Sequence, residues 1–209
     1  MKKINLILKY AKILVLILFP ALIFGQKNIS NNLAKYMQAQ VEVNNFSGTV
    51  LITKNGSVLL KKAYGLADYE WNIKNTVDTK FQLASVTKQF TATAILQLVE
   101  KGKLSLNDHL SKFFPDYPKA DSVTIHMLLS HSSGLALGFK ELALSTISVD
   151  SAYSEIKKIP YEFTPGTKSA YSNIGYYLLG KIIEKVSGEK YADYLRKNIF
   201  EKAGMKNTG

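Results

Sequence analysis

The sequence predicts an α+β domain that is mostly helical and carries an incomplete antiparallel sheet. Residues 47–54 and 57–64 are rich in Val, Leu, Ile and Thr, and Asn55-Gly56 joins them as a tight hairpin turn. The periodic segments that follow have helical spacing. A lone hairpin is marginally stable and exposes its edges, so its strands need neighbours. No segment after residue 124 has the pattern of a strand that could pair with the hairpin, so we expect further strands beyond the C-terminal end.

Before the hairpin, residues 30–43 are expected to form an amphipathic helix. Its apolar positions recur near helical spacing at Leu33, Tyr36, Met37 and Val41. After the hairpin, residues 65–80 read as a polar connection that contains the only tryptophan, Trp71.

The remaining helices are delimited by glycine and proline, which end helices for conformational reasons. Residues 103–121, with Pro115 and Pro118, read as a loop between the first two of these helices. The expected helices are residues 85–101 ended by Gly102, 125–130, 150–158 ended by Pro160, 173–187 ended by Gly188, and 191–203.

Residues 1–25 differ from the rest of the 209-residue chain and read as a secretory signal. Lys2 and Lys3 form a positive start, and an apolar run of 12 residues follows over 13–24. The alternative is an uncleaved membrane anchor, although such a run is too short to span a bilayer comfortably. We therefore expect a globular domain over residues 26–209 that is secreted or periplasmic, and membrane-anchored only if the signal stays uncleaved.

Composition excludes several classes of function. The formal charge of +11 falls to +7 without the four lysines of residues 1–25. This charge suits an anionic envelope polymer, and a membrane-tethered basic module is one further interpretation. No dense Lys/Arg cluster with interleaved aromatic residues is present, so nucleic acid is not an expected partner. The absence of cysteine excludes disulfides and a thiol nucleophile, and the three histidines lack metal-site spacing, so no metal is expected.

Ser85 and Lys88 form the first motif that could carry chemistry. Residues three apart on a helix share a face, so the Lys88 amine can point toward the Ser85 hydroxyl. A serine is a weak nucleophile until a base takes its proton, and a buried lysine loses part of its preference for the charged form. The apolar residues before Ser85 favour burial of the pair. Two other Ser-x-x-Lys matches, at Ser154 and Ser187, suit solvent-exposed positions.

Tyr171-Ser-Asn173 is the only Tyr-x-Asn in a chain with 12 tyrosines. A phenol near a cation can shuttle a proton, and a carboxamide can both donate to and accept from an amide substrate. The alternative is a purely structural helix start, with Ser172 or Asn173 as the cap.

Three motifs occur in order along the chain: FQLASVTK at 81–88, MLLSHSSGL at 127–135 and FTPGTKSAYSNIGY at 163–176, followed by AGMKNT at 203–208. Together they resemble the serine β-lactamase and penicillin-binding protein superfamily, most of all its class C type with the related esterases and D-alanyl-D-alanine carboxypeptidases. The resemblance covers about residues 40–209. It implies a β-lactamase/transpeptidase-like fold and a serine hydrolase that forms an acyl-enzyme, without a cofactor.

The resemblance also implies roles for individual residues. Ser85 would be the acylated nucleophile, Lys88 would hold or accept its proton, and Tyr171 would relay protons to the leaving group and activate water. Asn173 would bind the substrate amide, while His131 and Gly134 would shape a loop. The implied substrates are β-lactams, D-Ala-D-Ala peptides or small esters, small molecules or peptidoglycan-like in kind.

One departure from the family pattern is a missing third motif, Lys-Thr-Gly or His-x-Gly, on a later strand that also supplies an oxyanion-hole N–H. The terminal Lys206-Asn-Thr-Gly209 is not this motif, because it matches the segment after the Tyr-x-Asn helix. The resemblance thus implies a front portion that lacks C-terminal strands. A second interpretation stays open: a catalytically impaired truncated remnant or a cell-envelope binding protein. Neither the exact substrate nor the oligomeric state follows from the sequence.

Overall fold

The computed structural model describes residues 28–138 and 149–209. The segment predicted as a secretory signal, residues 1–25, lies outside the described residues. The described chain forms two compact units, one ending at Gln82 and the other beginning at Leu83. Helices and short antiparallel strand pairs make up these units, so the predicted α+β class is confirmed.

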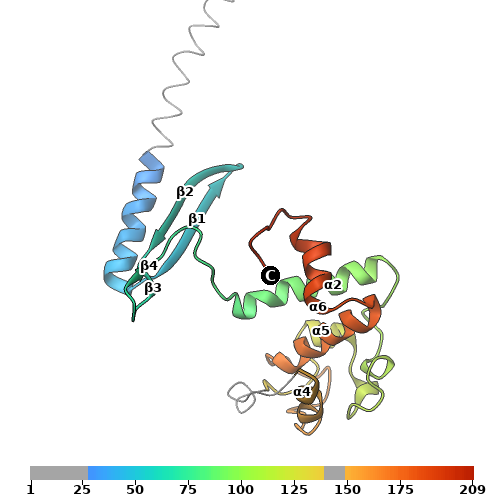
Figure 1. The fold of residues 1–209 in the computed structure, drawn as a ribbon. Coiled ribbons are helices and arrows are strands. Elements are labelled where there is room, and N and C mark those ends of the chain that lie inside the picture. Colours follow the sequence, from blue (N-terminus) through green and yellow to red (C-terminus); the bar gives the residue numbers. More distant parts are fainter. Residues whose placement is uncertain (1–27, 139–148) are drawn as a thin grey trace, which may run out of the picture. The chain divides into compact units, whose positions relative to one another are not determined.

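In the first unit, a helix over residues 28–44 lies along a two-stranded antiparallel hairpin (Figure 1). Strands β1 (Gly48–Lys54) and β2 (Ser57–Tyr64) confirm the predicted hairpin. Asn55 and Gly56 have φ values of 51° and 76°, the positive values that a two-residue turn between twisted strands requires.

The buried face of this helix differs from the prediction at Tyr36. That side chain is 62% exposed, whereas the neighbouring Met37 is 9% exposed and packs with Leu60 and Tyr64. Successive residues on a helix point about 100° apart, so only one of the two can face the hairpin. Partly buried side chains complete this small core: Leu33, Ala34, Val41, Phe46, Val50 and Ile52.

The predicted polar connection contains a second, very short hairpin of β3 (Leu66–Asp68) and β4 (Ile73–Lys74). Strands of two or three residues are too short to show an alternating pattern, so the sequence did not indicate them. Asn75 joins them to the larger hairpin: its Nδ2 donates to Ser47 Oγ at 3.0 Å and to Tyr64 O at 2.9 Å.

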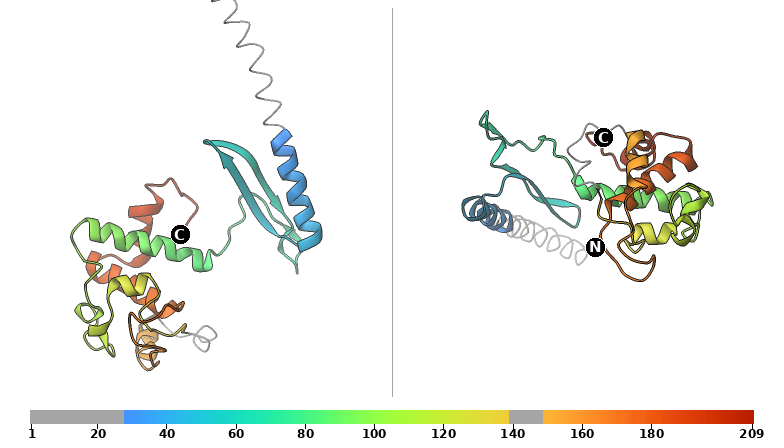
Figure 2. Two further views of the ribbon diagram at one scale, coloured as in Figure 1. Left: turned by 180° about the vertical axis from the view of Figure 1, so that it is seen from behind. Right: turned by 90° about the horizontal axis from the view of Figure 1, so that it is seen from below.

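The second unit is built on two long helices that pack together, α2 (Thr87–Glu100) and α5 (Asn173–Ser187) (Figure 2). Short helices α3 (Ile125–Leu129) and α6 (Tyr191–Leu195) pack against α5, and α4 (Val149–Ile156) adds to the same unit. The predicted loop over residues 103–121 contains the 3-10 turns Leu110–Lys112 and Ala120–Ser122. Fully buried side chains form the centre of this core, among them Ile95, Leu98, Leu110, Ile125, Leu128, Leu178, Leu179, Ile182 and Ile183.

Helix α5 has the predicted bounds because both of its ends are capped. Ser172 Oγ accepts the Gly175 N–H at 3.1 Å, which satisfies a donor that the first turn leaves without a helical partner. The Ser172 hydroxyl donates in turn to Ala136 O at 2.8 Å. At the other end, Gly188 has a φ of 75°, the left-handed conformation that ends helices.

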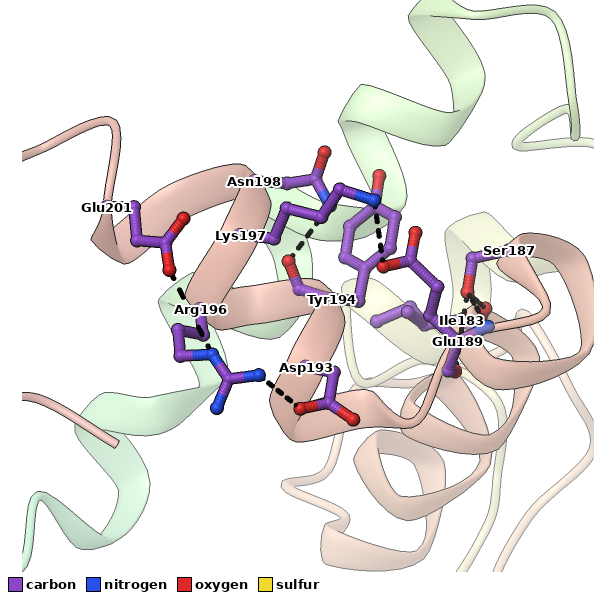
Figure 3. Close-up of polar contacts among 9 residues, drawn as sticks. All are labelled: Ile183, Ser187, Glu189, Asp193, Tyr194, Arg196, Lys197, Asn198 and Glu201. Carbon is purple, nitrogen blue, oxygen red and sulfur yellow. Dashed lines mark hydrogen bonds and ion pairs between the residues drawn. The ribbon is translucent and has the colours of Figure 1, made fainter.

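The predicted helix over residues 191–203 changes its hydrogen-bond pattern after Leu195 but stays helical, because Arg196 and Glu201 both keep right-handed helical backbone angles. A single π-type turn, Arg196–Phe200, follows α6 and is anchored by the buried Phe200 ring, which meets Phe90 edge-on at 5.2 Å. Figure 3 shows the polar contacts around this turn: Arg196 pairs with Asp193 at 2.6 Å and Glu201 at 4.0 Å, and Lys197 pairs with Glu189 at 3.4 Å. These pairs are exposed, so packing of Phe200 contributes more to this segment than they do.

Within the described ranges, no helix combines the length and apolar character that a membrane span requires. The described residues after Lys74 add no strand to either sheet, which agrees with the helical reading of that part of the sequence.

Two glycines with the same backbone conformation allow packing to be separated from backbone strain. Gly134 (φ 76°) leaves no room for a side chain, because a Cβ there would lie 2.2 Å from Phe163 O. Gly188 (φ 75°) has no atom within 4 Å of its would-be Cβ. We expect Gly188→Ala to cost about 1–2 kcal/mol of unfolding free energy from the left-handed backbone alone. Gly134→Ala should cost about 1–3 kcal/mol more, because the Phe163 backbone must move. Denaturant titration of both variants checks this, and equal losses would contradict the observed close approach.

Candidate active site

Ser85 lies in a 3-10 turn, Ala84–Val86, that leads directly into α2. The turn is closed by the Val86 N–H, which donates to Leu83 O at 3.0 Å. Ala84 has a φ of 46°, a left-handed conformation that costs an L-residue about 1–2 kcal/mol. The hydroxyl that the sequence singles out therefore follows a strained residue at a helix start.

The expected burial of Ser85 is wrong. Its side chain is exposed, and the neighbouring Leu83 and Val86 are 41% and 53% exposed. Apolar composition predicts that residues tend to be buried, but it does not fix where the side chains of a tight turn point. Lys88, one turn further along the helix, is partly buried.

Lys88 is held among three of the predicted residues. Its Nζ donates to Asn173 Oδ1 at 2.8 Å and to Ser85 Oγ at 3.4 Å. The same amine lies 4.7 Å from the centre of the Tyr171 ring, over its face. These contacts fix the amine between the start of α2 and the start of α5.

Tyr171 completes the arrangement from the segment just before α5. Its hydroxyl donates to Ser85 Oγ at 2.6 Å. The pKa of the Tyr171 phenol is lowered, first by the Lys88 amine and then by the contact with Ser85. A lowered pKa increases the fraction of Tyr171 present as phenolate at a given pH. A phenolate beside a serine hydroxyl can accept its proton.

The structure thus brings together all four residues that the sequence predicted: Ser85 and Lys88 from the start of α2, Tyr171 and Asn173 from the start of α5. The alternative interpretation of this second motif, a structural helix start, is also correct, because Ser172 caps α5. Ser172 caps the helix, and the residues on either side of it contact the Ser–Lys pair.

The sequence reading missed Tyr176. Its ring centre lies 5.5 Å from Lys88 Nζ, and its hydroxyl donates to Leu129 O at 3.1 Å. Tyr176 comes three residues after Asn173 on α5, and this helical spacing places it on the same face. That spacing was the available signal.

His131 and Gly134 shape a loop, as the resemblance implied. His131 has a φ of 58°, and its Nδ1 accepts the Ser172 N–H at 3.1 Å. Gly134 O accepts the Glu162 N–H at 2.8 Å, where the two backbones approach closely. The loop therefore supports the segment that carries Tyr171.

Of the other two Ser-x-x-Lys matches, Ser154 is exposed as expected, whereas Ser187 is partly buried. Ser154 is exposed on α4, and Lys157 forms an ion pair with Asp116. Ser187 Oγ donates to Ile183 O at 2.6 Å and accepts the Glu189 N–H at 3.1 Å at the end of α5.

A cavity of about 300 Å³ lies beside Lys88, between α2 and α5. Its walls include Thr87 and Thr91 from α2 and Tyr177 from α5. The Thr91 and Tyr191 hydroxyls meet at its edge, 2.7 Å apart. Among the described residues, no group of three His, Asp or Glu side chains is placed to hold a metal ion.

The chain resembles known proteins over most of its length. The family model described as Beta-lactamase matches residues 33–209, which run through both compact units. The putative penicillin-binding protein PbpX of Bacillus subtilis is 38% identical over 164 residues, 78% of this chain and 41% of that protein. Penicillin-binding protein 4* of the same organism is 35% identical over 192 residues, 88% of this chain and 42% of that protein.

Solved structures agree with these matches. A class C beta-lactamase in complex with cefoxitin has a TM-score of 0.75 at 30% identity, covering 88% of this chain and 51% of that one. FmtA from Staphylococcus aureus has a TM-score of 0.74 at 30% identity, covering 83% and 49%. The chain spans less than half the length of the curated relatives named above. Its sequence and its fold show that it belongs to the Beta-lactamase family.

Proposed function

We propose that this chain carries the nucleophile and the proton-transfer groups of a serine hydrolase that works through an acyl-enzyme. One observation carries the proposal: Ser85 Oγ receives hydrogen bonds from both Tyr171 OH, at 2.6 Å, and Lys88 Nζ, at 3.4 Å. A serine needs a base within hydrogen-bond reach to become a nucleophile, and here two candidate groups meet that condition.

In the proposed first step, Ser85 Oγ attacks a substrate carbonyl carbon while its proton passes to the Tyr171 oxygen. The new O–C bond forms as the carbonyl electron pair moves onto oxygen. The tetrahedral intermediate then collapses, the bond to the leaving group breaks, and the leaving group takes the proton from Tyr171. Lys88 stabilises the phenolate form by its charge, since it lies over the Tyr171 ring.

In the second step, water replaces the leaving group. Tyr171 accepts a proton from water, which attacks the acyl carbon and releases Ser85 with its proton restored. The same group acts as base and then as acid in each half of the cycle, as general acid–base catalysis requires.

Asn173 is proposed to serve both the site and the substrate. Its Oδ1 accepts from Lys88 at 2.8 Å, which keeps the amine beside Ser85. A carboxamide also has two N–H donors, and these suit the carbonyl of a substrate amide.

The proposed substrates share a carbonyl with a good or strained leaving group: β-lactams, D-Ala-D-Ala peptides or small esters. Two relatives carry penicillin-binding names and one solved neighbour is a class C beta-lactamase with cefoxitin, which supports this range. Export by residues 1–25 would place the protein where peptidoglycan-like substrates occur, outside the cytoplasm.

A second candidate function is a cell-envelope binding protein, or a catalytically impaired form that keeps the motifs without turnover. The exposure of Ser85 favours this second candidate, because electrostatic stabilisation of acyl transfer is strongest in sites that exclude water. The two candidates differ in whether an acyl group on Ser85 is released.

Replacement of the nucleophile tests the proposal directly. We expect the full 209-residue chain to gain one adduct on Ser85 from a fluorescent penicillin and from a fluorophosphonate, seen by intact-mass spectrometry and peptide mapping. Ser85→Ala should abolish both adducts. Ser154→Ala, which removes the exposed Ser-x-x-Lys serine of α4, is the matched control and should leave them unchanged. Labelling of Ser85→Ala would refute the assignment, and an adduct that never hydrolyses would favour the binding protein.

Replacement of Tyr171 by Phe tests the proton relay. The change keeps the ring beneath Lys88 and removes the hydroxyl, so acylation should slow by about 10²–10⁴-fold. In the wild-type chain the rate should rise with pH through the lowered pKa of Tyr171, because the phenolate is the base. That dependence should be absent in Tyr171→Phe. Tyr176→Phe, which loses only the hydroxyl bound to Leu129 O, is the control; stopped-flow labelling across pH provides the measurement.

A further inference from the structure

His131 contacts the chain on both sides of Tyr171. Its carbonyl oxygen accepts the Ala170 N–H at 2.9 Å, and its Nδ1 accepts the Ser172 N–H at 3.1 Å. Ala170 and Ser172 are the residues immediately before and after Tyr171. One residue therefore fixes the backbone of the segment that presents the phenol to Ser85.

The imidazole also contacts the Tyr171 ring itself. The two ring centres are 4.6 Å apart with planes inclined by 32°, and the Tyr176 ring lies on the same imidazole at 5.0 Å and 34°. Aromatic pairs at these separations are attractive. The imidazole is thus held in place by Tyr176 and limits how far the Tyr171 ring can tilt.

The backbone of His131 is bent to make these contacts possible. Its φ of 58° is left-handed, a conformation that non-glycine residues adopt rarely and at a cost. This conformation lets the carbonyl and the side chain of a single residue reach Ala170 and Ser172. Such strain persists only where surrounding contacts determine it, and it is concentrated at functional sites.

We propose that His131, as a neutral imidazole, is the positioning residue that holds the Tyr171 hydroxyl against Ser85 Oγ. This inference rests on the function proposed above and adds a residue to it. His131 acts through Tyr171, and the structure gives it no part in bond making.

The proposal requires an unprotonated Nδ1, because that atom accepts a hydrogen bond. The ionisable groups that act on the imidazole are Lys88 from α2, through its charge, and Tyr171 and Tyr176, whose rings pack against it. The pKa of His131 is lowered, first by burial and then by the Lys88 charge, which favours the neutral form. Acidification should protonate Nδ1, break its bond to Ser172 and add a second cation beside Lys88. Tyr171 should therefore be held in position at pH values above the ordinary histidine pKa. This positioning should be lost as the pH falls through the lowered pKa of His131.

Two substitutions separate positioning from titration. His131→Ala removes the acceptor and the ring. It should lower the maximal rate of fluorophosphonate acylation of the full chain by about 10²-fold, with little change in the half-saturating concentration, because the hydroxyl is displaced. His131→Asn keeps an acceptor oxygen, tolerates a left-handed backbone and does not titrate. It should restore much of the rate and weaken the fall of rate between about pH 7.5 and about pH 5.

His126→Asn is the matched control, since His126 is exposed on the neighbouring helix α3, and it should match the wild-type chain in rate and pH profile. Thermal unfolding shows whether each variant is folded. If His131→Ala does not fold, His131→Asn still decides: a shallower acid dependence at retained rate, with the part due to Tyr171 kept, supports the proposal, and an unchanged acid dependence overturns it. A folded His131→Ala with wild-type rate and pH profile would overturn it.

A measurement without any substrate distinguishes this proposal from the proposed function. In ¹⁵N spectra of histidine-labelled chain, the His131 signals are assigned by their loss in His131→Asn. Nδ1 should be unprotonated at neutral pH, and should titrate with a midpoint below about 6.5. A protonated Nδ1 at neutral pH would sink the proposal even if Ser85 acylates normally. Absence of acylation in the wild-type chain, with the expected Nδ1 signal, would instead count against the proposed function.

Discussion

The hydrogen bond between Lys88 and Asn173 is the contact on which the candidate site depends. It joins residues 85 positions apart, at the first turns of α2 and α5, the two longest of the described helices in the second unit. The buried core between α2 and α5 sets how closely these helices approach, so hydrophobic packing places two polar groups at 2.8 Å. Because close-packed interiors deform little, the relative position of Ser85 and Tyr171 follows from the same packing.

Loops with unusual backbone conformations then refine this position. Ala84 and His131 are both left-handed, one immediately before Ser85 and the other bonded to both neighbours of Tyr171. Gly134 allows the backbone at Phe163 to approach within a distance that no side chain would permit. These features cost stability where they occur. They lie around Ser85 and the Tyr171 phenol, the groups proposed to carry the reaction, where a small displacement would have the largest effect on rate.

The regular parts of the second unit could be predicted from the sequence, because caps and periodicity are local signals. The bounds of α5 followed from Gly188 and from the Ser172-Asn173 start, and all four predicted site residues lie together. Three features could not be predicted. The strands β3 and β4 are too short to show a pattern, and the exposure of Ser85 depends on the turn geometry at Ala84. The helix after Tyr191 contains a π-type turn at Arg196–Phe200, where the buried Phe200 ring meets Phe90, a residue 110 positions away in the chain.

Two separate effects would contribute to the proposed acyl transfer: proton transfer at Ser85 and stabilisation of the charge that develops on the carbonyl oxygen. Proton transfer by positioned groups contributes about 10²–10⁴-fold, and in the proposed function Lys88 and Tyr171, both in contact with Ser85, would supply it. The negative charge that develops on the carbonyl oxygen is stabilised by other groups, the hydrogen-bond donors of an oxyanion hole. Each such donor contributes about 10²–10³-fold to the rate. The family resemblance implies that one such donor comes from a strand that carries the third motif. Acylation by a reactive probe depends mostly on proton transfer, whereas turnover of an unreactive amide needs both proton transfer and oxyanion stabilisation. Labelling and turnover therefore measure different parts of the site, and a chain with rapid labelling and slow turnover would have an activated nucleophile with an incomplete oxyanion hole.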